Sequence, residues 1–353
     1  MDLSDLARRP TEWLRGTGGM SDVVISSRVR LARNLAGMPF LGRCSAEQTV
    51  EIEHRLRDCI LAAGFADETI YVDIDQADEI DRGLLVERHL ISRQHANGDH
   101  RRGVAFSPSE TLAIMVNEED HLRLQVLRSG LELDDAVAEA IAADNRLEES
   151  LSFAFHRKYG YLTACPTNVG TGLRVSVMLH LPALKMTGEI EKVFRAAHDM
   201  RLALRGLYGE GTEATGDFFQ ISNQTTLGKS EEQIIREFCV DTLPHIIEYE
   251  RRAREVLLSK RAIAIDDRAD RSLAVLRAAK LISSDETMYL LSLIRMGVTL
   301  GQCRDLDLAT LNELFLMTQP AHLQKMLGRK LEPFERAEAR ATYIRQRIEA
   351  ACK

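Results

Sequence analysis

The stretch Cys165-Pro-Thr-Asn-Val-Gly-Thr-Gly-Leu-Arg174 runs directly into the apolar alternation Val175-Ser-Val-Met-Leu179. Alternation with a period of two predicts a half-buried β-strand. A thiol, a glycine-rich backbone and a cation at the start of that strand can together form a phosphate-handling site. A Cys-Pro turn that simply leads into a buried strand is the structural alternative, and these residues alone leave both interpretations open.

Composition limits the class of protein. The chain has 353 residues, 45% hydrophobic and 28% charged, with a formal net charge of -7. This is typical of a soluble globular protein of two or three domains with a sizeable core. The net negative charge argues against a protein that binds nucleic acids or membrane surfaces.

Cysteine usage and the N-terminal residues indicate a cytoplasmic protein. The first fourteen residues carry several charges and lack the apolar centre of a signal peptide. No run reaches the roughly 18 consecutive apolar residues that span a bilayer. The six cysteines are scattered without a Cys-x-x-Cys pair. This spacing favours free thiols in a reducing compartment over disulfides or a zinc site.

Residues 22–255 mix strand and helix signals. Ser45 and Gln48 form a capping box that predicts a helix to about Ala63. Strands are expected at 23–25, leading into 26–30, and at 71–74, 84–91, 103–106, 112–116 and 218–222. Helices are expected at 134–155, 187–206 and 230–258.

After about residue 256 only helix signals remain, with stops near Gly297, Pro320 and Gly328. We therefore expect an α+β fold: an N-terminal extension (1–21), a mixed domain (22–255) and an all-helical domain (256–353).

Nucleotide handling requires groups that hold phosphates, and the common glycine-rich loops are missing. Gly211 and Gly216 have the P-loop spacing, but the chain continues with Asp217 and Phe218 instead of Lys and Ser or Thr. The chain instead offers arginines at strand ends and turns: Arg28, Arg30, Arg123, Arg174 and Arg205. Planar, permanently charged guanidinium groups suit phosphate oxygens, although each of these arginines alone also fits an ordinary surface position.

Two carboxylate segments add possible acid–base groups. Residues 117–123 (Asn-Glu-Glu-Asp-His-Leu-Arg) follow an apolar strand, where an acidic cluster is usually a solvated loop. Glu210 stands between Gly209 and Gly211, which indicates a bent backbone that directs one carboxylate into a site.

Five segments, in order, resemble those of the phosphagen (guanidino) kinases: residues 26–34, 87–92, 117–123, 165–174 and 205–210. The resemblance covers roughly residues 22–252 and implies a largely antiparallel sheet flanked by helices. It is closest to the bacterial branch that phosphorylates protein arginine. The helical domain that precedes the first segment in small-guanidine kinases is missing, and a helical C-terminal domain follows.

The resemblance also implies roles for individual residues. Glu119 and Glu210 would hold the substrate guanidinium, and Cys165 would contact the same group. ATP and Mg²⁺ are implied, with no metal site made by the protein alone. The implied nucleotide contacts are Ser26, Ser27, Arg28, Val29, Arg30, His89, Arg123, Arg174, Val175, Ser176, Val177, Met178, Arg205, Gly206, Leu207, Tyr208 and Gly209.

The C-terminal domain departs from the family in one motif. The bacterial branch carries Arg-Asp-x-x-Arg-Ala, a phosphoarginine pocket for allosteric control. Here Arg336 and Arg340 remain, but Ala337 replaces the aspartate. An exposed helix with arginines four residues apart is therefore the alternative to a working pocket.

The resemblance further implies a homodimer that acts on proteins with exposed arginines. A heat-shock repressor, a zinc-binding activator and a Clp ATPase are the partners it suggests. Two other functions remain open: a kinase of a free guanidino metabolite such as arginine, and a non-catalytic adaptor that binds phosphoarginine. The retained carboxylates and arginines argue against the adaptor.

Overall fold

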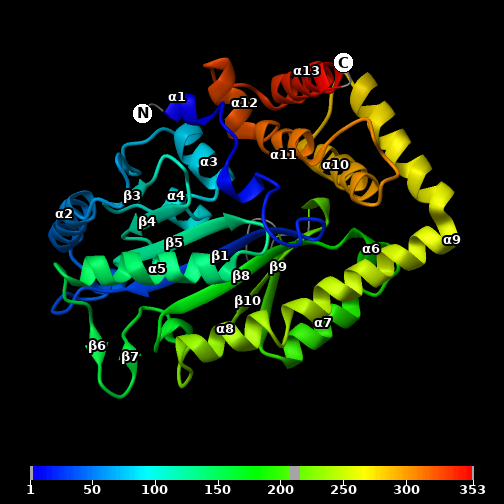
Figure 1. Cartoon of the computed structure of the whole chain (residues 1–353). Helices are drawn as coiled ribbons and strands as arrows, with labels where there is room; N and C mark the ends of the chain where they lie inside the picture. Colours follow the sequence, from blue (N-terminus) through cyan, green and yellow to red (C-terminus); the bar gives the residue numbers. More distant parts are fainter. Residues whose placement is uncertain (1–2, 207–214, 352–353) are drawn as a thin grey trace.

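The computed structural model describes residues 3–206 and 215–351. Leu207, Tyr208, Gly209 and Glu210, which the sequence placed in the site, lie outside the described residues. The described part is built around an eight-stranded sheet in the order β2-β3-β4-β5-β1-β8-β10-β9 (Figure 1). Every neighbouring pair is antiparallel. The predicted α+β class with an antiparallel sheet is confirmed.

The strands are β1 Val24–Arg33, β2 Ile70–Asp73, β3 Gly103–Phe106, β4 Leu112–Val116, β5 Leu122–Ser129, β8 Leu173–His180, β9 Leu202–Gly206 and β10 Phe218–Asn223. A separate hairpin pairs β6 Phe155–His156 with β7 Gly160–Tyr161. Short 3₁₀ helices cover Glu12–Leu14 (η1), Leu41–Arg43 (η2), Pro166–Asn168 (η3) and Thr215–Asp217 (η4).

One face of the sheet packs against helices and forms the main apolar core. Alternate strand residues such as Val29, Leu124, Val175 and Ile221 enter this core. The covering helices are α2 Ala46–Ala62, α5 Leu133–Glu148, α6 Pro182–Met186, α7 Ile190–Asp199, α8 Glu231–Cys239 and the first half of α9 Leu243–Ala278. Because strand side chains alternate, residues such as Arg28 and Arg174 face the other side.

The C-terminal helices pack on that other side of the sheet, near one end of its central strands. They are α10 Ser284–Thr299, α11 Leu308–Met317, α12 Pro320–Leu327 and α13 Pro333–Ala351. Their apolar side chains share a second core with Ile25, Leu127, Met178 and Phe218 of the sheet. This arrangement leaves the rest of the polar sheet face open to form a cavity.

Helix α9 joins the two parts. It runs along one side of the molecule from the sheet helices up to α10–α13 (Figure 1). The backbone leaves helical geometry at Arg261 (φ -146°, ψ 35°). The predicted domain division at 255/256 thus falls within this helix, six residues before the break, and it stays a prediction.

The N-terminal segment and α3 (Glu79–Glu87) tie the sheet to the C-terminal helices. Both carboxylate oxygens of Glu87 accept from the first amides of α12, Ala321 N at 2.7 Å and His322 N at 3.0 Å. The buried Arg88 donates to Glu110 at 2.7 Å and to the carbonyl of Pro10 at 3.1 Å. Helix α3 is therefore held by the N-terminal segment and by α12 at once.

The strand predicted at 84–91 is wrong, because residues 79–87 form α3. Asp78 caps the helix by accepting from Asp81 N at 2.7 Å. Leu84 and Leu85 lie in one turn of this helix and are buried. The apolar run that contains them resembles the pattern of a strand. Short apolar runs carry this ambiguity between helix and strand.

Three predicted helices were too long. The helix expected at 134–155 ends at Glu148, and the one expected at 187–206 is α7 followed by β9. Arg201, with φ 55°, turns the chain between these two elements. The helix expected at 230–258 is two helices, α8 and α9. Pro244 lies in the first turn of α9, a position that favours the start of a new helix.

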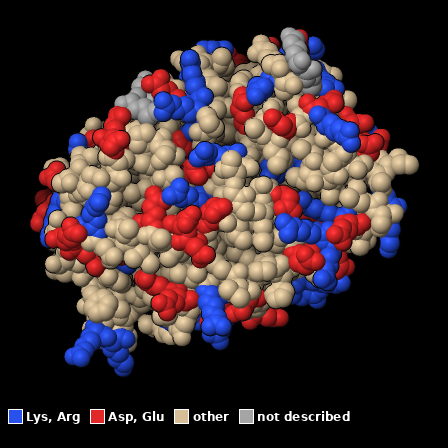
Figure 2. All heavy atoms as spheres, in the orientation of Figure 1, with Lys and Arg blue, Asp and Glu red and all other residues tan. Residues whose placement is uncertain are grey.

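The other predicted elements are confirmed, including the capping box at Ser45 and the helical end of the chain. None of the described helices is both long enough and apolar enough to span a bilayer. Acidic and basic side chains are interspersed over the face drawn in Figure 2.

Candidate active site

A cavity of about 660 Å³ opens on the polar face of the sheet. It brings together residues from all five segments singled out in the sequence. Its lining includes Arg28, Arg30, His89, Ile91, Ser92, Arg93, Gln94, Glu118, Glu119, Arg123, Cys165, Thr167, Asn168, Arg174, Ala203, Arg205, Gln220, Gln224 and Thr225. The fifth segment contributes Arg205, while Glu210 lies outside the described residues.

Strand alternation gathers the five predicted arginines on this face. Arg28 and Arg30 lie on β1, and Arg30 stands directly opposite Arg174 of β8. Arg205 lies on β9 and Arg123 on β5. Like charges directly opposite each other on neighbouring strands destabilise a sheet. The pairing of Arg30 with Arg174 therefore destabilises the fold unless an anion in the cavity offsets their charges.

The electrostatics of the cluster support an anion site. Burial, together with Arg123, Arg174 and Arg205, lowers the pKa of Arg28 to about 9. Burial, together with Arg28 and the three arginines just named, lowers the pKa of Arg30 well below its ordinary value. Nε and Nη2 of Arg30 are buried without a hydrogen-bond partner among the described residues. Phosphate oxygens would supply those partners and the missing negative charge.

Neutral side chains on neighbouring strands orient the guanidinium groups. Arg28 Nη2 donates to Gln220 Oε1 of β10 at 2.5 Å. Arg174 donates to Ser222 Oγ through Nη2 at 3.0 Å and Nε at 3.3 Å. These partners hold the two arginines in place without cancelling their charge.

His89 lies on the wall of the cavity just after α3. Its backbone has a positive φ of 58°. Its imidazole packs edge-to-face with the ring of Trp13, with the ring centroids 4.4 Å apart and the ring planes at 87°. Burial, with Arg28 and Arg93, lowers the pKa of His89 to about 3. The imidazole is therefore neutral at physiological pH.

Glu118 and Glu119 are adjacent but have different environments. Glu118 is buried, accepts from Ser92 Oγ at 2.6 Å and pairs with Arg123 at 2.5 Å. Burial alone would raise the pKa of Glu118, but Arg123 and Ser92 outweigh burial and bring it to about 2. Glu119 is half-buried, and burial raises its pKa above the ordinary value. Glu119 is therefore the better proton acceptor.

Glu118 was not predicted as a site residue. The sequence shows it in the same acidic run as Glu119, but spacing alone cannot separate the glutamate that pairs with Arg123 from the one that faces the cavity. The structure makes Glu118 the fixed partner of an arginine of the anion site.

Cys165 lines the cavity where η3 begins, and its Sγ lies 3.0 Å from Thr167 Oγ1. The glycine-rich turn that follows brings the chain to Arg174 on β8. Gly172 adopts φ 66°, and a Cβ there would stand 2.7 Å from the carbonyl oxygen of Ala32. This turn therefore requires glycine at position 172. It lets the thiol of Cys165 and the guanidinium of Arg174 line the same cavity.

The remaining predicted nucleotide contacts divide between the two faces of the sheet. Ser26, Ser176 and Met178 face the site side and line a small hollow beside Arg28. Side chains of Val29, Val175 and Val177 enter the main core, so the structure does not bring them to the cavity.

Ser27 is fully buried and donates to the carbonyl of Gly130 at 2.8 Å. Gly206 ends β9, one position after Arg205.

The two C-terminal arginines have partners within the chain. Arg340 is buried and donates to the carbonyl oxygens of Thr318 at 2.8 Å and Ile282 at 2.9 Å. Arg336 Nη1 donates to the carbonyl oxygen of Leu331 at 2.7 Å. The buried position of Arg340 does not fit an exposed helix face, and its two bonds tie α13 to the segments of Thr318 and Ile282. A phosphoarginine pocket at the pair stays a prediction.

Within residues 3–206 and 215–351, no three or more His, Cys, Asp or Glu side chains form a cluster suited to a metal ion. The described residues supply guanidinium groups, the half-buried carboxylate of Glu119 and the thiol of Cys165 to this cavity. Such a set can hold a polyphosphate and a cationic acceptor side by side.

Glu118→Gln will lower the free energy of unfolding at pH 7 by about 3 kcal/mol, because it leaves Arg123 buried without its counter-ion. The folded pKa of Glu118 is about 2 against an ordinary 4.5, so its stabilisation is complete above pH 4.5 and is lost as pH falls toward 2. Urea titrations of both proteins from pH 7 to pH 2 measure the difference. A difference that stays constant below pH 4.5 would contradict this role.

Comparisons with known proteins agree with this geometry. Residues 51–253 match the model of the ATP:guanido phosphotransferase C-terminal catalytic domain, and residues 262–353 match that of the protein-arginine kinase McsB C-terminal domain. The chain is similar to a protein-arginine kinase of Halothermothrix orenii, 46% identical over 99% of both chains. It is also similar to one of Symbiobacterium thermophilum, 47% identical over 98% of both.

Solved structures show the same likeness. The taurocyamine kinase of Schistosoma mansoni, solved with bound transition state analog components, has a TM-score of 0.59 and 30% identity. The match covers 70% of this chain and 35% of that duplicated chain. Lombricine kinase has a TM-score of 0.54 and 25% identity, over 65% of this chain and 66% of that one.

Proposed function

The chain belongs to the protein-arginine kinases of the ATP:guanido phosphotransferase family, and on this premise we propose how its residues share the reaction. The observation that carries the assignment is one cavity that holds a largely buried arginine cluster together with Glu119 and Cys165. The reaction converts ATP and a protein arginine into phosphoarginine and ADP.

Arg28, Arg30, Arg123, Arg174 and Arg205 bind the phosphates of ATP. The unpartnered Nε and Nη2 atoms of Arg30 support this role, as does the direct pairing of Arg30 with Arg174 across β1 and β8. During transfer these fixed positive charges stabilise the γ-phosphoryl group without further rearrangement. The neutral His89 borders the same region and contacts the nucleotide without adding charge.

Glu119 and Glu210 hold the substrate guanidinium and direct one nitrogen at the γ-phosphorus. A guanidinium has a pKa above about 12 and is a poor nucleophile until it loses a proton. As the N–P bond forms, the bond from phosphorus to the bridging oxygen breaks and its electron pair leaves with ADP. Glu119 accepts the proton from the attacking nitrogen, and its raised pKa favours that transfer. Cys165 contacts the same guanidinium beside the glycine-rich turn.

A Mg²⁺ ion bound with ATP would take most of its ligands from phosphate oxygens and water, because this ion commonly keeps several waters and takes few protein ligands at kinase sites. It would supply neutralisation of the phosphate charge. The arginines of this chain hold the remaining phosphate oxygens.

The acceptor is an arginine on the surface of a protein. Incubation with Mg-ATP and reduced, carboxymethylated lysozyme will add acid-labile phosphate to arginine side chains, detected by mass spectrometry under neutral conditions. Rapid turnover of free L-arginine with unmodified lysozyme would indicate a kinase of a small guanidine instead. Phosphoarginine binding without ADP formation would indicate an adaptor.

Residues 22–255 form the catalytic domain and residues 256–353 a domain for dimerisation and regulation. Large exposed apolar side chains in the helical part support a self-association surface: Ile263, Val275, Leu281, Tyr289, Leu327 and Phe334. The proposed downstream role is marking proteins for a Clp protease or inactivating a heat-shock repressor, with a zinc-binding activator. Light scattering of the purified chain tests the dimer, and co-purification tests the partners.

A further inference from the structure

A buried hydrogen bond joins the turn that carries Glu119 to the segment that carries Cys165. The donor is the main-chain N–H of Ala164, and Oδ1 of Asp120 accepts from it at 2.6 Å. Asp120 is 2% exposed. Asp120 directly follows Glu119, and Ala164 directly precedes Cys165. This one bond therefore connects the neighbours of two residues that line the cavity.

Asn34, the first residue after β1, ties both segments to the sheet. It is 1% exposed, and its Nδ2 donates to Asp120 Oδ1 at 2.6 Å and to the carbonyl oxygen of Leu162 at 3.0 Å. Its Oδ1 accepts from the main-chain N–H of His121 at 2.9 Å. Because oxygen atoms face Nδ2 and an N–H faces Oδ1, these contacts fix the orientation of the amide. We call Asn34, Asp120 and Ala164 the Asn34 joint.

The preceding residue, Arg33, holds the other end of the segment that carries Cys165. Its Nη1 donates to the carbonyl oxygen of Thr171 at 2.9 Å, and its guanidinium carbon lies 3.5 Å from the ring centroid of Tyr161. The buried Asp144 of α5 pairs with the same guanidinium. Two consecutive residues at the end of β1 therefore contact both ends of residues 161–172.

Glu119 and Cys165 both lie outside the strands, so contacts other than the sheet ladder must set their places on the cavity. A guanidinium is planar and rigid, and two groups contact it together only at a fixed separation. Misplacement of a reacting group by about 1 Å can lower a rate on the order of a hundredfold. The arginines of β1, β5 and β8 are held by the register of the sheet, so their places do not depend on the Asn34 joint.

We propose that Asn34 is a positioning residue for phosphoryl transfer: through the Asn34 joint it sets the separation of Glu119 and Cys165, so that both contact one substrate guanidinium. This inference rests on the roles proposed above for Glu119 and Cys165. It gives the end of β1 a part in holding the acceptor, in addition to the phosphate-binding arginines that the same strand carries.

Asn34→Ala removes the joint and will lower kcat for phosphorylation of reduced, carboxymethylated lysozyme about thirtyfold. The KM for ATP will stay within about twofold, because the arginine cluster keeps its positions. Asp120→Ala removes the same joint from the other side and will give a similar loss. Asp120→Asn keeps an oxygen that can accept from Asn34 and Ala164, so it will retain kcat within about fivefold of wild type.

A Cys165→Ala background separates positioning from loss of folded protein. In that background Asn34→Ala will lower kcat by about fivefold only, because one of the two groups that it displaces is already missing. A loss of folded protein would instead lower kcat by the same factor in both backgrounds.

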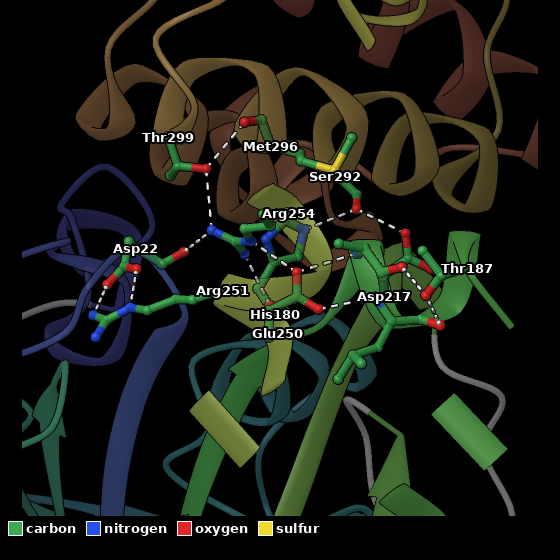
Figure 3. A network of polar contacts seen from close by, with 12 residues as sticks. Asp22, His180, Thr187, Asp217, Glu250, Arg251, Arg254, Ser292, Met296 and Thr299 are labelled. Carbon is green, nitrogen blue, oxygen red and sulfur yellow. Dashed lines mark hydrogen bonds and ion pairs between the residues drawn. The ribbon is translucent and has the colours of Figure 1, made fainter. Parts of the chain in front are cut away.

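Ser292→Ala is the matched control, because it also removes a buried polar side chain with several partners. Ser292 Oγ lies 2.9 Å from His180 Nε2 and donates to Asp217 Oδ2 at 3.0 Å, in a polar network between α10 and the end of β8 (Figure 3). None of these three residues lines the part of the cavity that the structure describes. Ser292→Ala will lower the melting temperature and keep wild-type kcat.

Equal kcat for Asn34→Ala and Ser292→Ala would overturn the inference, as would an equal factor of loss in the wild-type and Cys165→Ala backgrounds. Should Asn34→Ala fail to fold, the two Asp120 variants decide, and equal kcat for Asp120→Ala and Asp120→Asn would overturn it.

Glu119→Gln and Cys165→Ala test the premise separately. Low kcat in both beside wild-type kcat in Asn34→Ala would reject only the positioning role. Wild-type kcat in both would remove the proposed roles of Glu119 and Cys165, and the inference with them.

Discussion

Glu119→Gln will lower kcat about a thousandfold while leaving the KM for ATP within about twofold. Glutamine keeps the size of the side chain and can still contact a guanidinium, but it cannot accept a proton. Glu119 is half-buried in the cavity and has a raised pKa, which suits a general base. Steady-state kinetics of ADP formation with lysozyme as acceptor measure both constants.

The neighbouring Glu118→Gln provides the matched comparison for this prediction. Glu118 pairs with Arg123 of the phosphate site, so its loss will raise the KM for ATP more than it lowers kcat. The pH profile gives a second test, since the wild-type rise of kcat with pH should be absent in Glu119→Gln. Similar kinetic changes in both variants would reject Glu119 as the proton acceptor.

Arg30→Met will stabilise the ATP-free protein by about 1–2 kcal/mol and lower kcat/KM about ten-thousandfold. Arg30 is 9% exposed, faces Arg174 across the strands and has two nitrogen atoms without a hydrogen-bond partner among the described residues. A methionine of similar length removes a buried charge that none of those residues pairs with. The same change removes donors that ATP needs. Urea unfolding without nucleotide and steady-state kinetics measure the two effects.

Arg128→Met is the control for Arg30→Met. Arg128 lies on β5, pairs with Glu139 and does not line the cavity. It should give no gain in stability and no loss of turnover. An Arg30→Met protein that is less stable than wild type and still binds ATP normally would show that Arg30 serves the fold and not the phosphates.

The structure gathers many of the predicted site residues in one cavity, whereas several of the predicted elements were wrong or too long. Arg28, Arg123, Arg174 and Cys165 come together in one cavity because they belong to segments recognisable by their order and residue types. The strand expected at 84–91 failed because an apolar pair such as Leu84 and Leu85 fits a helix and a strand equally well. Local pattern cannot decide such cases without the tertiary contacts.

Roles that depend on how the chain folds were not predictable. Glu118 and Arg123 are only five residues apart, but the sequence does not show that the turn into β5 pairs them. The valines of β1 and β8 lie within recognised segments, but alternation directs them into the core. Ser292 carries no motif, and its contact with Asp217 joins residues 75 positions apart. Each of these facts depends on the register of the sheet or on the packing of α10.

The apolar cluster shared by Ile25, Leu127, Met178 and Phe218 with the C-terminal helices has a thermodynamic consequence. Unfolding of either part would expose those side chains to water, so neither part has an independent free energy of unfolding. The division proposed at 255/256 therefore separates two proposed functions. It does not separate two units that unfold independently. Natural selection on the helical part therefore acts on the kinase itself, even at positions that never meet a substrate.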